Sequence, residues 1–570
     1  MRHDHKLETK TLTIEGKNLT INDVVRVGLA RPGDINILLS ESAAEKINKS
    51  RKIVEKILDD GLIVYGINTG FGSYAEKVIS REETELLQRY LIKSHATGAG
   101  DPYSPEIIRS AMLIRANTHA RGNSGIRLKL VQILLDMLNK GVVPYVPEHG
   151  SLGASGDLAP LSHIALCLSK DPKSNRAEER LTKKAKAGET FTIQETREAI
   201  KESGEAYLWQ GSSWVKMTGI EAMAKAGIDR IALEAKEGLA LNNGCSVSAA
   251  TSCFVIHFGE RAQQSADLIA ALVMEAVGGF ESAFSCEIND SRPYYGQMEV
   301  ARRIREYIKD SGVAKHVDEI QNSKNVMNDF NKVQDSYSIR CIPQVHGPVL
   351  DALEYAKSVI SIEINAATDN PLIFPDSNYI NKAFSGGNFH GQNISLSIDF
   401  LSIALCTLGN ISERRIFKLM ENRLNGGLPD FLIHPVSGKH GLMSGAMIMQ
   451  YTAASLASEN KVLSHPASAD SITSSADRED FVSMAPISAR KTYRILDNLE
   501  NILAIECWCS IIALRLRHEE KAKLSRTATN TLNFMKEDIS EFNEDRVTYD
   551  EVKWIKSLIH SGELLKAASK

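Results

Sequence analysis

The chain has 570 residues, which is enough for a large core or for two to three domains. Its 43% hydrophobic and 24% charged residues are the balance of an ordinary globular protein. A net charge of -4 does not indicate nucleic acid or an anionic membrane as a partner. No stretch approaches the roughly 20 uninterrupted apolar residues that a membrane helix needs, and the first ten residues, MRHDHKLETK, lack the apolar core of a signal peptide.

Cysteine usage indicates the redox environment. None of the eight cysteines forms a CxxC pair. They lie at Cys167, Cys245, Cys253, Cys286, Cys341, Cys406, Cys507 and Cys509. We therefore expect reduced, mostly buried thiols in a cytoplasmic protein.

The first section of the chain, residues 1–211, has short elements and many Gly and Pro breaks. The segment KTLTIEG near its start alternates like a strand and predicts local pairing, without a large sheet. Residues 170–201 are strongly charged, which favours an excursion at the surface. We expect this section to form an N-terminal mixed domain.

Long helical patterns follow. They cover residues 247–277, which contain no proline, residues 393–425 and residues 493–517. The last is apolar nearly all round, as in helices that are buried among other helices. The sequence therefore predicts a mainly α fold, with a central bundle of long helices over residues 212–490 and C-terminal helices over residues 491–570.

The glycine-rich stretch GSLGASGDLAP, residues 150–160, invites a chemical interpretation. It does not match the G-x-S-x-G turn of hydrolases, because Asp157 stands two residues after Ser155. It also lacks the lysine of a phosphate-binding loop. The plainest interpretation is a tight turn that leads into a helix, with Asp157 as the helix cap.

A second interpretation is a loop that reacts with itself. If the fold compresses it, the nitrogen of Gly156 approaches the carbonyl of Ala154, since glycine has no side chain in the way. Ring closure and loss of the Ser155 hydroxyl as water would leave an electrophilic methylidene group. Such a ring would act as a built-in cofactor.

The stretch resembles the signature of the aromatic amino acid ammonia-lyase and aminomutase family. The other motifs that carry the resemblance, in family order, are YGINTGFG (65–72), LIKSHATG (91–98), GLALNNG (238–244), QDSYSIRCIPQV (334–345), TDNPLIF (368–374), SGGNFHG (385–391) and ASENKVLSHPAS (457–468). The resemblance implies a 4-methylidene-imidazol-5-one ring made from Ala154, Ser155 and Gly156, with no external cofactor. It also implies a homotetramer whose active sites are shared between chains.

The resemblance assigns roles to single residues. It implies that Tyr65 removes the β-proton of the substrate, for which its pKa must fall below the ordinary value near 10. Arg340 would clamp the substrate carboxylate with its planar guanidinium. Tyr337 and Gln334 would line the reactive ring. Standing alone, each of these residues would be taken as structural or solvated.

Further residues are assigned in the same way. Asn243 would bond the carboxylate or the ring region, and Phe389 would cover the electrophile and exclude water. By themselves they would be taken as a turn residue and a core residue. The histidines at 163, 257 and 390 have no metal-ligand spacing, so we expect no metal site.

Substrate choice depends on a few positions. The Ser-His pair ending at His95 occurs in histidine ammonia-lyases and in some tyrosine aminomutases, and Glu459 would accept a hydrogen bond from an imidazole. Asn425 stands where histidine lyases typically have methionine. Asn242 and the Tyr294-Tyr295 pair also depart from the histidine pattern.

We therefore expect an ammonia-lyase that converts L-histidine to trans-urocanate and ammonia. The alternative is a tyrosine or phenylalanine ammonia-lyase or 2,3-aminomutase with the same machinery. A remote alternative is an inactive helical scaffold with an unmodified loop.

Overall fold

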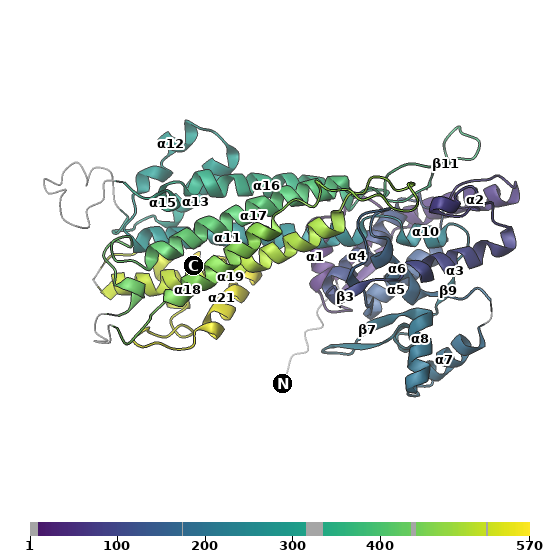
Figure 1. Cartoon of the computed structure of the whole chain (residues 1–570), viewed down its shortest axis with the longest axis horizontal. Coiled ribbons are helices and arrows are strands. Elements are labelled where there is room, and N and C mark those ends of the chain that lie inside the picture. The colour runs from purple at the N-terminus through teal and green to yellow at the C-terminus, as the bar shows by residue number, and fades with distance from the viewer. Residues whose placement is uncertain (1–9, 174, 315–333, 435–440, 520–521) are drawn as a thin grey trace. The chain divides into compact units, whose positions relative to one another are not determined.

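The computed structural model describes residues 10–173, 175–314, 334–434, 441–519 and 522–570 (Figure 1). It divides into two compact units, each built from three segments of the chain. Unit 1 comprises residues 1–254, 357–398 and 466–490, and unit 2 comprises residues 255–356, 399–465 and 491–570. The sequence-based division at residues 211 and 490 differs from these units, since its middle section contributes to both.

Four of the five chain boundaries between the units lie inside long helices, which therefore contribute residues to both units. These helices are α11 (Ser246–Ala276), α16 (Ile342–Glu363), α17 (Gln392–Leu419) and α19 (Ala485–Glu519). Three of them correspond to the long helices that the sequence predicts, with ends that differ by one to eight residues. The mainly α fold is confirmed (Figure 1).

Unit 1 combines helices with small sheets. Its helices are α1 (Ile21–Leu29), α2 (Glu41–Asp59), α3 (Thr84–His95), α4 (Pro105–Ala120), α5 (Leu128–Lys140), α6 (Leu158–Leu168), α7 (Arg176–Lys186), α8 (Ile193–Ser203), α9 (Gly219–Lys225) and α10 (Glu237–Asn242), with 3-10 turns η1 (Gly72–Tyr74) and η2 (Arg81–Glu83). Pro105 starts α4 behind a Ser104 cap, and every residue from Ile107 to Ala120 is buried, so α4 forms the core of this unit.

The sheets of unit 1 have two or three strands each. Their strands are β1 (Lys10–Ile14), β2 (Ile35–Leu39), β3 (Ala99–Pro102), β4 (Val142–Pro144), β5 (Pro147–His149), β6 (Ser169–Lys170), β7 (Glu205–Trp209), β8 (Trp214–Thr218), β9 (Ile231–Ala232), β10 (Leu372–Ile373) and β11 (Ala383–Phe384). The pairs β1–β2 and β6–β9 are parallel, whereas β3–β5, β10–β11 and the β4–β7–β8 sheet are antiparallel. The predicted local pairing of the KTLTIEG segment is confirmed.

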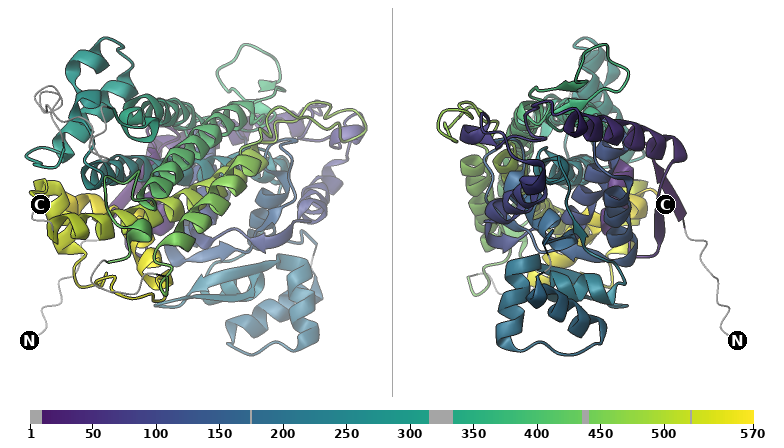
Figure 2. Two further views of the ribbon diagram at one scale, coloured as in Figure 1. Left: turned by 60° about the vertical axis from the view of Figure 1, so that its left-hand side comes forward. Right: turned by 90° about the vertical axis from the view of Figure 1, so that its right-hand side faces the viewer.

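The charged segment at residues 170–201 contains α7 and most of α8. These helices lie beside the β7–β8 hairpin at the edge of unit 1 (Figure 2). Leu181 and Ala185 of α7 point into a small cluster with Phe191, while most of the charged side chains are exposed. The predicted surface excursion is therefore a small helical subdomain with its own apolar contacts.

Unit 2 is helical. Besides its parts of the long helices it contains η3 (Glu281–Phe284), α12 (Cys286–Asp290), α13 (Tyr295–Tyr307), α15 (Tyr337–Arg340), η4 (Asp430–Leu432), α18 (Met447–Leu463), α20 (Arg526–Phe534), α21 (Tyr549–Ser561) and α22 (Glu563–Ala568). Trp508 of α19 is fully buried, with Cys507 and Cys509 on either side. The predicted burial of the 493–517 helix is confirmed.

The helix α17 is unusually apolar. By length and hydropathy it could cross a membrane, although its sequence contains no long uninterrupted apolar run. However, 67% of its most apolar window is buried inside the protein, as in a core helix. The cysteines are all free thiols, and Cys286 is the exposed one among them.

Candidate active site

The loop of residues 150–157, between β5 and α6, is tightly folded. Ser155 has a φ of 50°, in the left-handed region that favours glycine, and the neighbouring Gly156 has a φ of 77°. The N–H of Gly156 donates to the carbonyl of Gly153 at 3.2 Å, and the Ser151 hydroxyl donates to the carbonyl of Gly156 at 2.6 Å. The three residues Ala154, Ser155 and Gly156 thus lie in a compact, strained turn.

Gly156 sits in a cradle that excludes any side chain. A Cβ atom at this position would collide with the carbonyl of Gly244, and one at Gly244 would collide with the carbonyl of Thr368. The backbones are also joined directly, because Gly244 donates to Ser155 O at 3.2 Å and Asp157 donates to Gly244 O at 2.7 Å. Close approach of one backbone to another explains why glycine stands at both positions.

Asp157 occupies the N-cap position of α6, as predicted, but its side chain caps a different helix. Its side chain makes no cap hydrogen bond to α6, which directly follows it. Instead its Oδ2 accepts from the N–H groups of Val247 and Ser248, both at 2.8 Å, at the start of α11. The predicted N-cap position is therefore confirmed, whereas the side-chain cap of α6 that it implied is wrong. The reason is that the loop runs against the N-terminus of α11, whose orphan amides attract the carboxylate.

A second segment, residues 482–484, packs on the other side of the loop. Met484 N donates to Leu152 O at 3.0 Å, and the side chains of Val482 and Met484 form an apolar cluster with Ala154. A Cβ at Gly153 would meet the hydroxyl of Ser483. The loop is thus held from both sides.

Glu479, three residues before that segment, reaches the centre of the site. The Ser155 hydroxyl donates to its Oε1 at 3.3 Å, and the Ser474 hydroxyl donates to its Oε2 at 3.2 Å. Glu479 was not singled out from the sequence, because it has no periodic signal and its partner Ser155 lies 324 residues away in the chain.

Tyr65 lies in the loop between α2 and η1 and is partly buried. Burial raises the pKa of its hydroxyl above the ordinary 10.0, and the charge of Glu479 raises it further. A hydrogen bond with the backbone of Gly72 acts in the opposite direction. Burial and Glu479 therefore act against the lowered pKa that a base requires.

His95 is the last residue of α3. Its Nδ1 lies 2.8 Å from the carbonyl of Leu91 and 3.0 Å from the Ser94 hydroxyl. Since a carbonyl only accepts, Nδ1 carries the proton and Nε2 is left as an acceptor. Burial lowers the pKa of His95, while the Leu91 carbonyl and the Glu479 charge act to raise it.

Asn243 follows α10 and is buried beside the loop. Its Nδ2 donates to Asn370 O at 3.3 Å, and its carbonyl accepts from Nη2 of the buried Arg115 at 2.7 Å. Its Oδ1 has no hydrogen-bond partner among the described residues. A buried acceptor left open in this way suits a ligand that brings a donor.

Phe389 lies between β11 and α17 and is partly buried. Its carbonyl accepts a hydrogen bond from the Cys245 thiol at 3.0 Å. Cys245 follows Gly244 directly, so Phe389 is tied to the same backbone as the Gly156 cradle. Unit 1 thus holds Tyr65, His95, Asn243, Phe389 and the Ala-Ser-Gly turn.

The other predicted site residues belong to unit 2. Arg340 of α15 donates from Nε to the carbonyl of Asp335 at 3.0 Å, and its guanidinium lies 4.5 Å from the centre of the Tyr337 ring. In the amide orientation that its neighbours require, Gln334 accepts from Arg340 Nε at 3.0 Å. The ring of Tyr337 is 70% exposed. The three residues therefore form one cluster at the surface of unit 2.

Two further predicted residues lie apart from this cluster in the chain. Glu459 is exposed on α18. Asn425 follows α17 and is fully buried, where its Nδ2 donates to Leu419 O at 3.0 Å.

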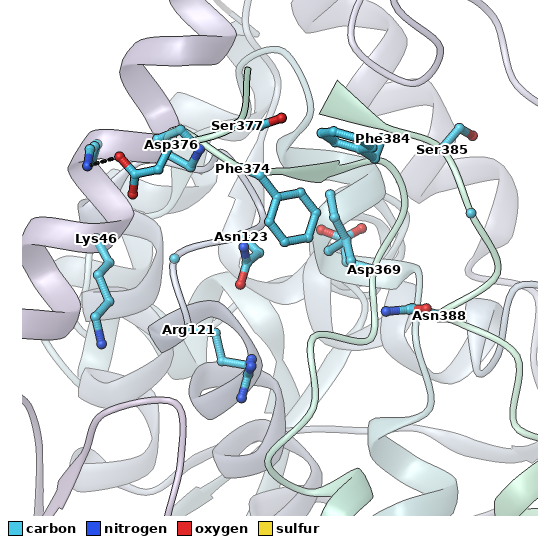
Figure 3. Close-up of a pocket in the computed structure, with 15 residues that line it drawn as sticks. Lys46, Arg121, Asn123, Asp369, Phe374, Asp376, Ser377, Phe384, Ser385 and Asn388 are labelled. Atoms are coloured by element: carbon cyan, nitrogen blue, oxygen red, sulfur yellow. Dashed lines mark hydrogen bonds and ion pairs between the residues drawn. The ribbon is translucent and has the colours of Figure 1, made fainter. Parts of the chain in front are cut away.

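A cavity of about 800 Å³ opens elsewhere in unit 1 (Figure 3). Figure 3 shows Phe374 and Phe384 on one side and Lys46 and Arg121 on another. Lys49 and Asp376 pair across its rim at 2.5 Å. As far as the described residues go, its lining includes none of the predicted site residues.

The family model for aromatic amino acid lyases matches residues 19–537. The chain belongs to the aromatic amino acid lyase family. This lyase is 44% identical over 555 residues to the histidine ammonia-lyase of Caldanaerobacter subterraneus subsp. tengcongensis, and the match covers 97% of each chain. The comparison confirms the resemblance and makes this lyase a carbon–nitrogen lyase.

Solved structures agree with this assignment. The histidine ammonia-lyase of Trypanosoma cruzi matches this lyase with a TM-score of 0.82 and 34% identity, over 98% of this chain and 95% of that chain. The tyrosine aminomutase of Streptomyces globisporus matches it with a TM-score of 0.84 and 32% identity, over 98% of both chains. The family's fold is therefore present over nearly the whole lyase.

Proposed function

We propose that the protein converts L-histidine to trans-urocanate and ammonia, using a 4-methylidene-imidazol-5-one ring that forms from Ala154, Ser155 and Gly156. The observation that supports the ring is the compressed turn, in which Ser155 takes a left-handed φ of 50° and a Cβ at Gly156 would collide with Gly244. The space around Gly156 can hold a ring made from the backbone but leaves no room for a side chain at Gly156, the third residue of that ring. No external cofactor is required.

The ring supplies an electrophilic carbon that turns the substrate's amino group into a better leaving group. The chain's own residues do the remaining work. Tyr65 accepts the β-proton, which requires positive charge nearby, because burial and Glu479 both raise its pKa. Arg340, whose guanidinium is a planar two-pronged donor, holds the substrate carboxylate. Asn243 offers its open Oδ1 to a donor on the substrate.

Histidine is favoured as the substrate by His95 and by the relative in Caldanaerobacter, named a histidine ammonia-lyase. The neutral ring of His95 presents Nε2 as an acceptor for an imidazole N–H. Glu459 would accept from the other side of the substrate ring, and Phe389 would exclude water. Asn425 would adjust the shape of the pocket.

The residues of unit 2 reach the site through assembly in this proposal. A cytoplasmic homotetramer would bring Gln334, Tyr337 and Arg340 from one subunit to the Ala-Ser-Gly turn of another. Mixed tetramers test this, because Tyr65→Phe and Arg340→Met subunits would restore activity when co-assembled if the two residues serve one site from different chains. Two inactive parents that stay inactive after mixing would contradict shared sites.

The substrate is tested with the purified protein and a panel of amino acids. We expect the absorbance of urocanate to rise with L-histidine, and no coumarate or cinnamate from tyrosine or phenylalanine. Ser155→Ala is the control that should abolish the product. Turnover of tyrosine with no urocanate would contradict the proposal.

A tyrosine or phenylalanine lyase or 2,3-aminomutase is the second candidate. It is favoured by the match to the tyrosine aminomutase of Streptomyces globisporus, with a TM-score of 0.84. Polar residues at Asn242 and Asn425 also suit a phenol ring. Formation of a β-amino acid in the same panel would identify the mutase outcome.

A further inference from the structure

We propose that Glu479 is the acid that protonates the Ser155 hydroxyl when it leaves as water during formation of the ring. The inference rests on the proposed function, since it concerns the maturation of the same turn. Its central observation is the 3.3 Å contact between Ser155 Oγ and Glu479 Oε1. The hydroxyl oxygen is a reacting atom, so Glu479 would be a catalytic residue of maturation.

A strained hairpin presents this carboxyl group. Residues 474 and 479 are paired by backbone hydrogen bonds in both directions, at 2.9 and 3.3 Å. Between them Ser475, Ala476 and Asp477 have φ values of 50°, 51° and 65°, all in the left-handed region. This region of backbone conformation is unfavourable for residues other than glycine. Such a turn persists where the surrounding structure requires its shape.

Contacts on both sides of Glu479 fix that shape. On the N-terminal side of Glu479, Ser475 lies against Gly72, so that a Cβ at Gly72 would collide with the Ser475 hydroxyl. The backbone of Gly72 is in turn hydrogen-bonded to Tyr65. On the C-terminal side of Glu479, Met484 is bonded to Leu152 of the reactive loop. The hairpin is therefore held between the Tyr65 loop and the Ala-Ser-Gly turn, with Glu479 aimed at Ser155.

The second carboxyl oxygen is also held. Ser474 donates its hydroxyl to Oε2, so that Oε1 is directed toward Ser155. The charge of Glu479 also acts on Tyr65 and His95, which places it among the groups that would surround the substrate. A surface glutamate with a merely solvating role would not have this set of neighbours.

The proton balance is simple. Ring closure between Gly156 N and the Ala154 carbonyl carbon releases a first water. In the second loss, the Cα–H and Cβ–O bonds of Ser155 break and a Cα=Cβ bond forms. Glu479 is a carboxylate in the resting contact, so it first takes a proton from solvent. The carboxylic acid then gives this proton to the departing hydroxyl, which leaves as water, while solvent water takes the Cα proton. The carboxylate is regenerated, and no oxidant or reductant is needed.

The test measures the intact mass of purified protein at intervals after synthesis. We expect wild-type protein to lack two waters and Glu479→Gln to accumulate protein that lacks only one, with the second loss slowed by about 10²-fold or more. Gln keeps the volume and a hydrogen-bonding end but has no acidic proton. Glu479→Asp should restore part of the rate. Ser474→Ala keeps the acid and should lose both waters.

The outcomes separate the two proposals. A Glu479→Gln protein that loses both waters as fast as wild type overturns the role of Glu479 and leaves the proposed function intact. A wild-type protein that retains both waters overturns the ring, and the role of Glu479 with it. Circular dichroism and the oligomeric state monitor folding. If Glu479→Gln is misfolded, a folded Glu479→Asp protein that matures no faster than an acid-free Glu479→Ala protein also overturns the inference.

Discussion

The carboxylate of Asp157 accepts both the backbone N–H and the hydroxyl of Ser248, at 2.8 and 2.6 Å. Together with the N–H of Val247, this gives a fully buried carboxylate three donors at the start of α11. Since Asp157 directly follows the Ala-Ser-Gly turn, the turn is fastened to the end of a long helix. The position of the reactive residues is thus set by a helix that begins about 90 residues later.

Removing this carboxylate should loosen the turn. Asp157→Ala leaves buried donors without an acceptor, so we expect a loss of about 3 kcal/mol in stability and a visibly lower melting temperature in calorimetry. Asp101→Ala, at an exposed aspartate of β3, is the control and should leave the melting temperature unchanged. Equal melting temperatures for the two variants would show that the cap does not stabilise the fold.

Gly156→Ala should block ring formation. The added Cβ would collide with Gly244 at a φ of 77°, so the turn has to open. Gly188→Ala is a matched control, because Gly188 has a φ of 74° and nothing within 4 Å of the added atom. We expect the control to cost about 1–2 kcal/mol and to mature normally. Intact mass distinguishes the Gly156→Ala variant from the Gly188→Ala control. Loss of both waters in the two variants would contradict the claim that the surroundings of Gly156 exclude a side chain.

Tyr65→Phe separates catalysis from maturation. The variant lacks only the hydroxyl, so we expect both waters to be lost from the turn while kcat falls by about 10²–10⁴-fold. Mass spectrometry and steady-state kinetics on one preparation give both quantities. An unchanged kcat would remove Tyr65 from the proton transfer, and an unmodified turn would place it in maturation instead.

His163 should make the fold sensitive to acid. Its Nε2 accepts the N–H of Gly98 at 3.1 Å, and burial lowers its pKa from 6.5 to about 4. As the pH falls below 6.5, the unfolded protein binds a proton on His163, whereas the folded protein binds it only near pH 4. This share of stability is complete above pH 6.5 and is lost as the pH falls toward 4, by up to about 3 kcal/mol.

Urea unfolding at about pH 7.5 and about pH 5 measures this loss. His163→Gln, which offers Gly98 an acceptor that does not titrate, should reduce the difference between the two midpoints. His149→Gln, at an exposed histidine of β5, should not. The same pH difference in wild type and His163→Gln would assign the acid sensitivity to other groups.

The helical periodicity of the sequence predicted the fold class and the long helices well. Residues 247–277 match α11 to within one residue, because an unbroken apolar pattern without proline leaves few other choices. The segment at residues 493–517 was predicted too short, since α19 starts at Ala485, and the polar first turns hide its beginning. The two units were not predicted, because each is assembled from three distant segments.

Residues of the candidate site could be named from the sequence where a motif is local. Ala154, Ser155 and Gly156 lie in one turn, and Tyr65, His95, Asn243 and Phe389 share their unit with it. The role of Asp157 was missed because its partners lie 90 and 91 residues away. Glu479 was missed for the same reason, since its contact with Ser155 spans 324 residues. Contacts between residues so far apart in the sequence cannot be inferred from the spacing of residues within a motif.

The placement of four of the unit boundaries inside α11, α16, α17 and α19 has a practical consequence. No truncation from either terminus yields one unit by itself, because the three segments of each unit alternate along the chain with those of the other. Fragments, deletion variants and chimeras that exchange a whole domain with a relative will therefore misfold for reasons unrelated to the function being tested. Exchanges of short exposed loops, such as the turn at residues 210–213 between β7 and β8, are the changes that this architecture can accept.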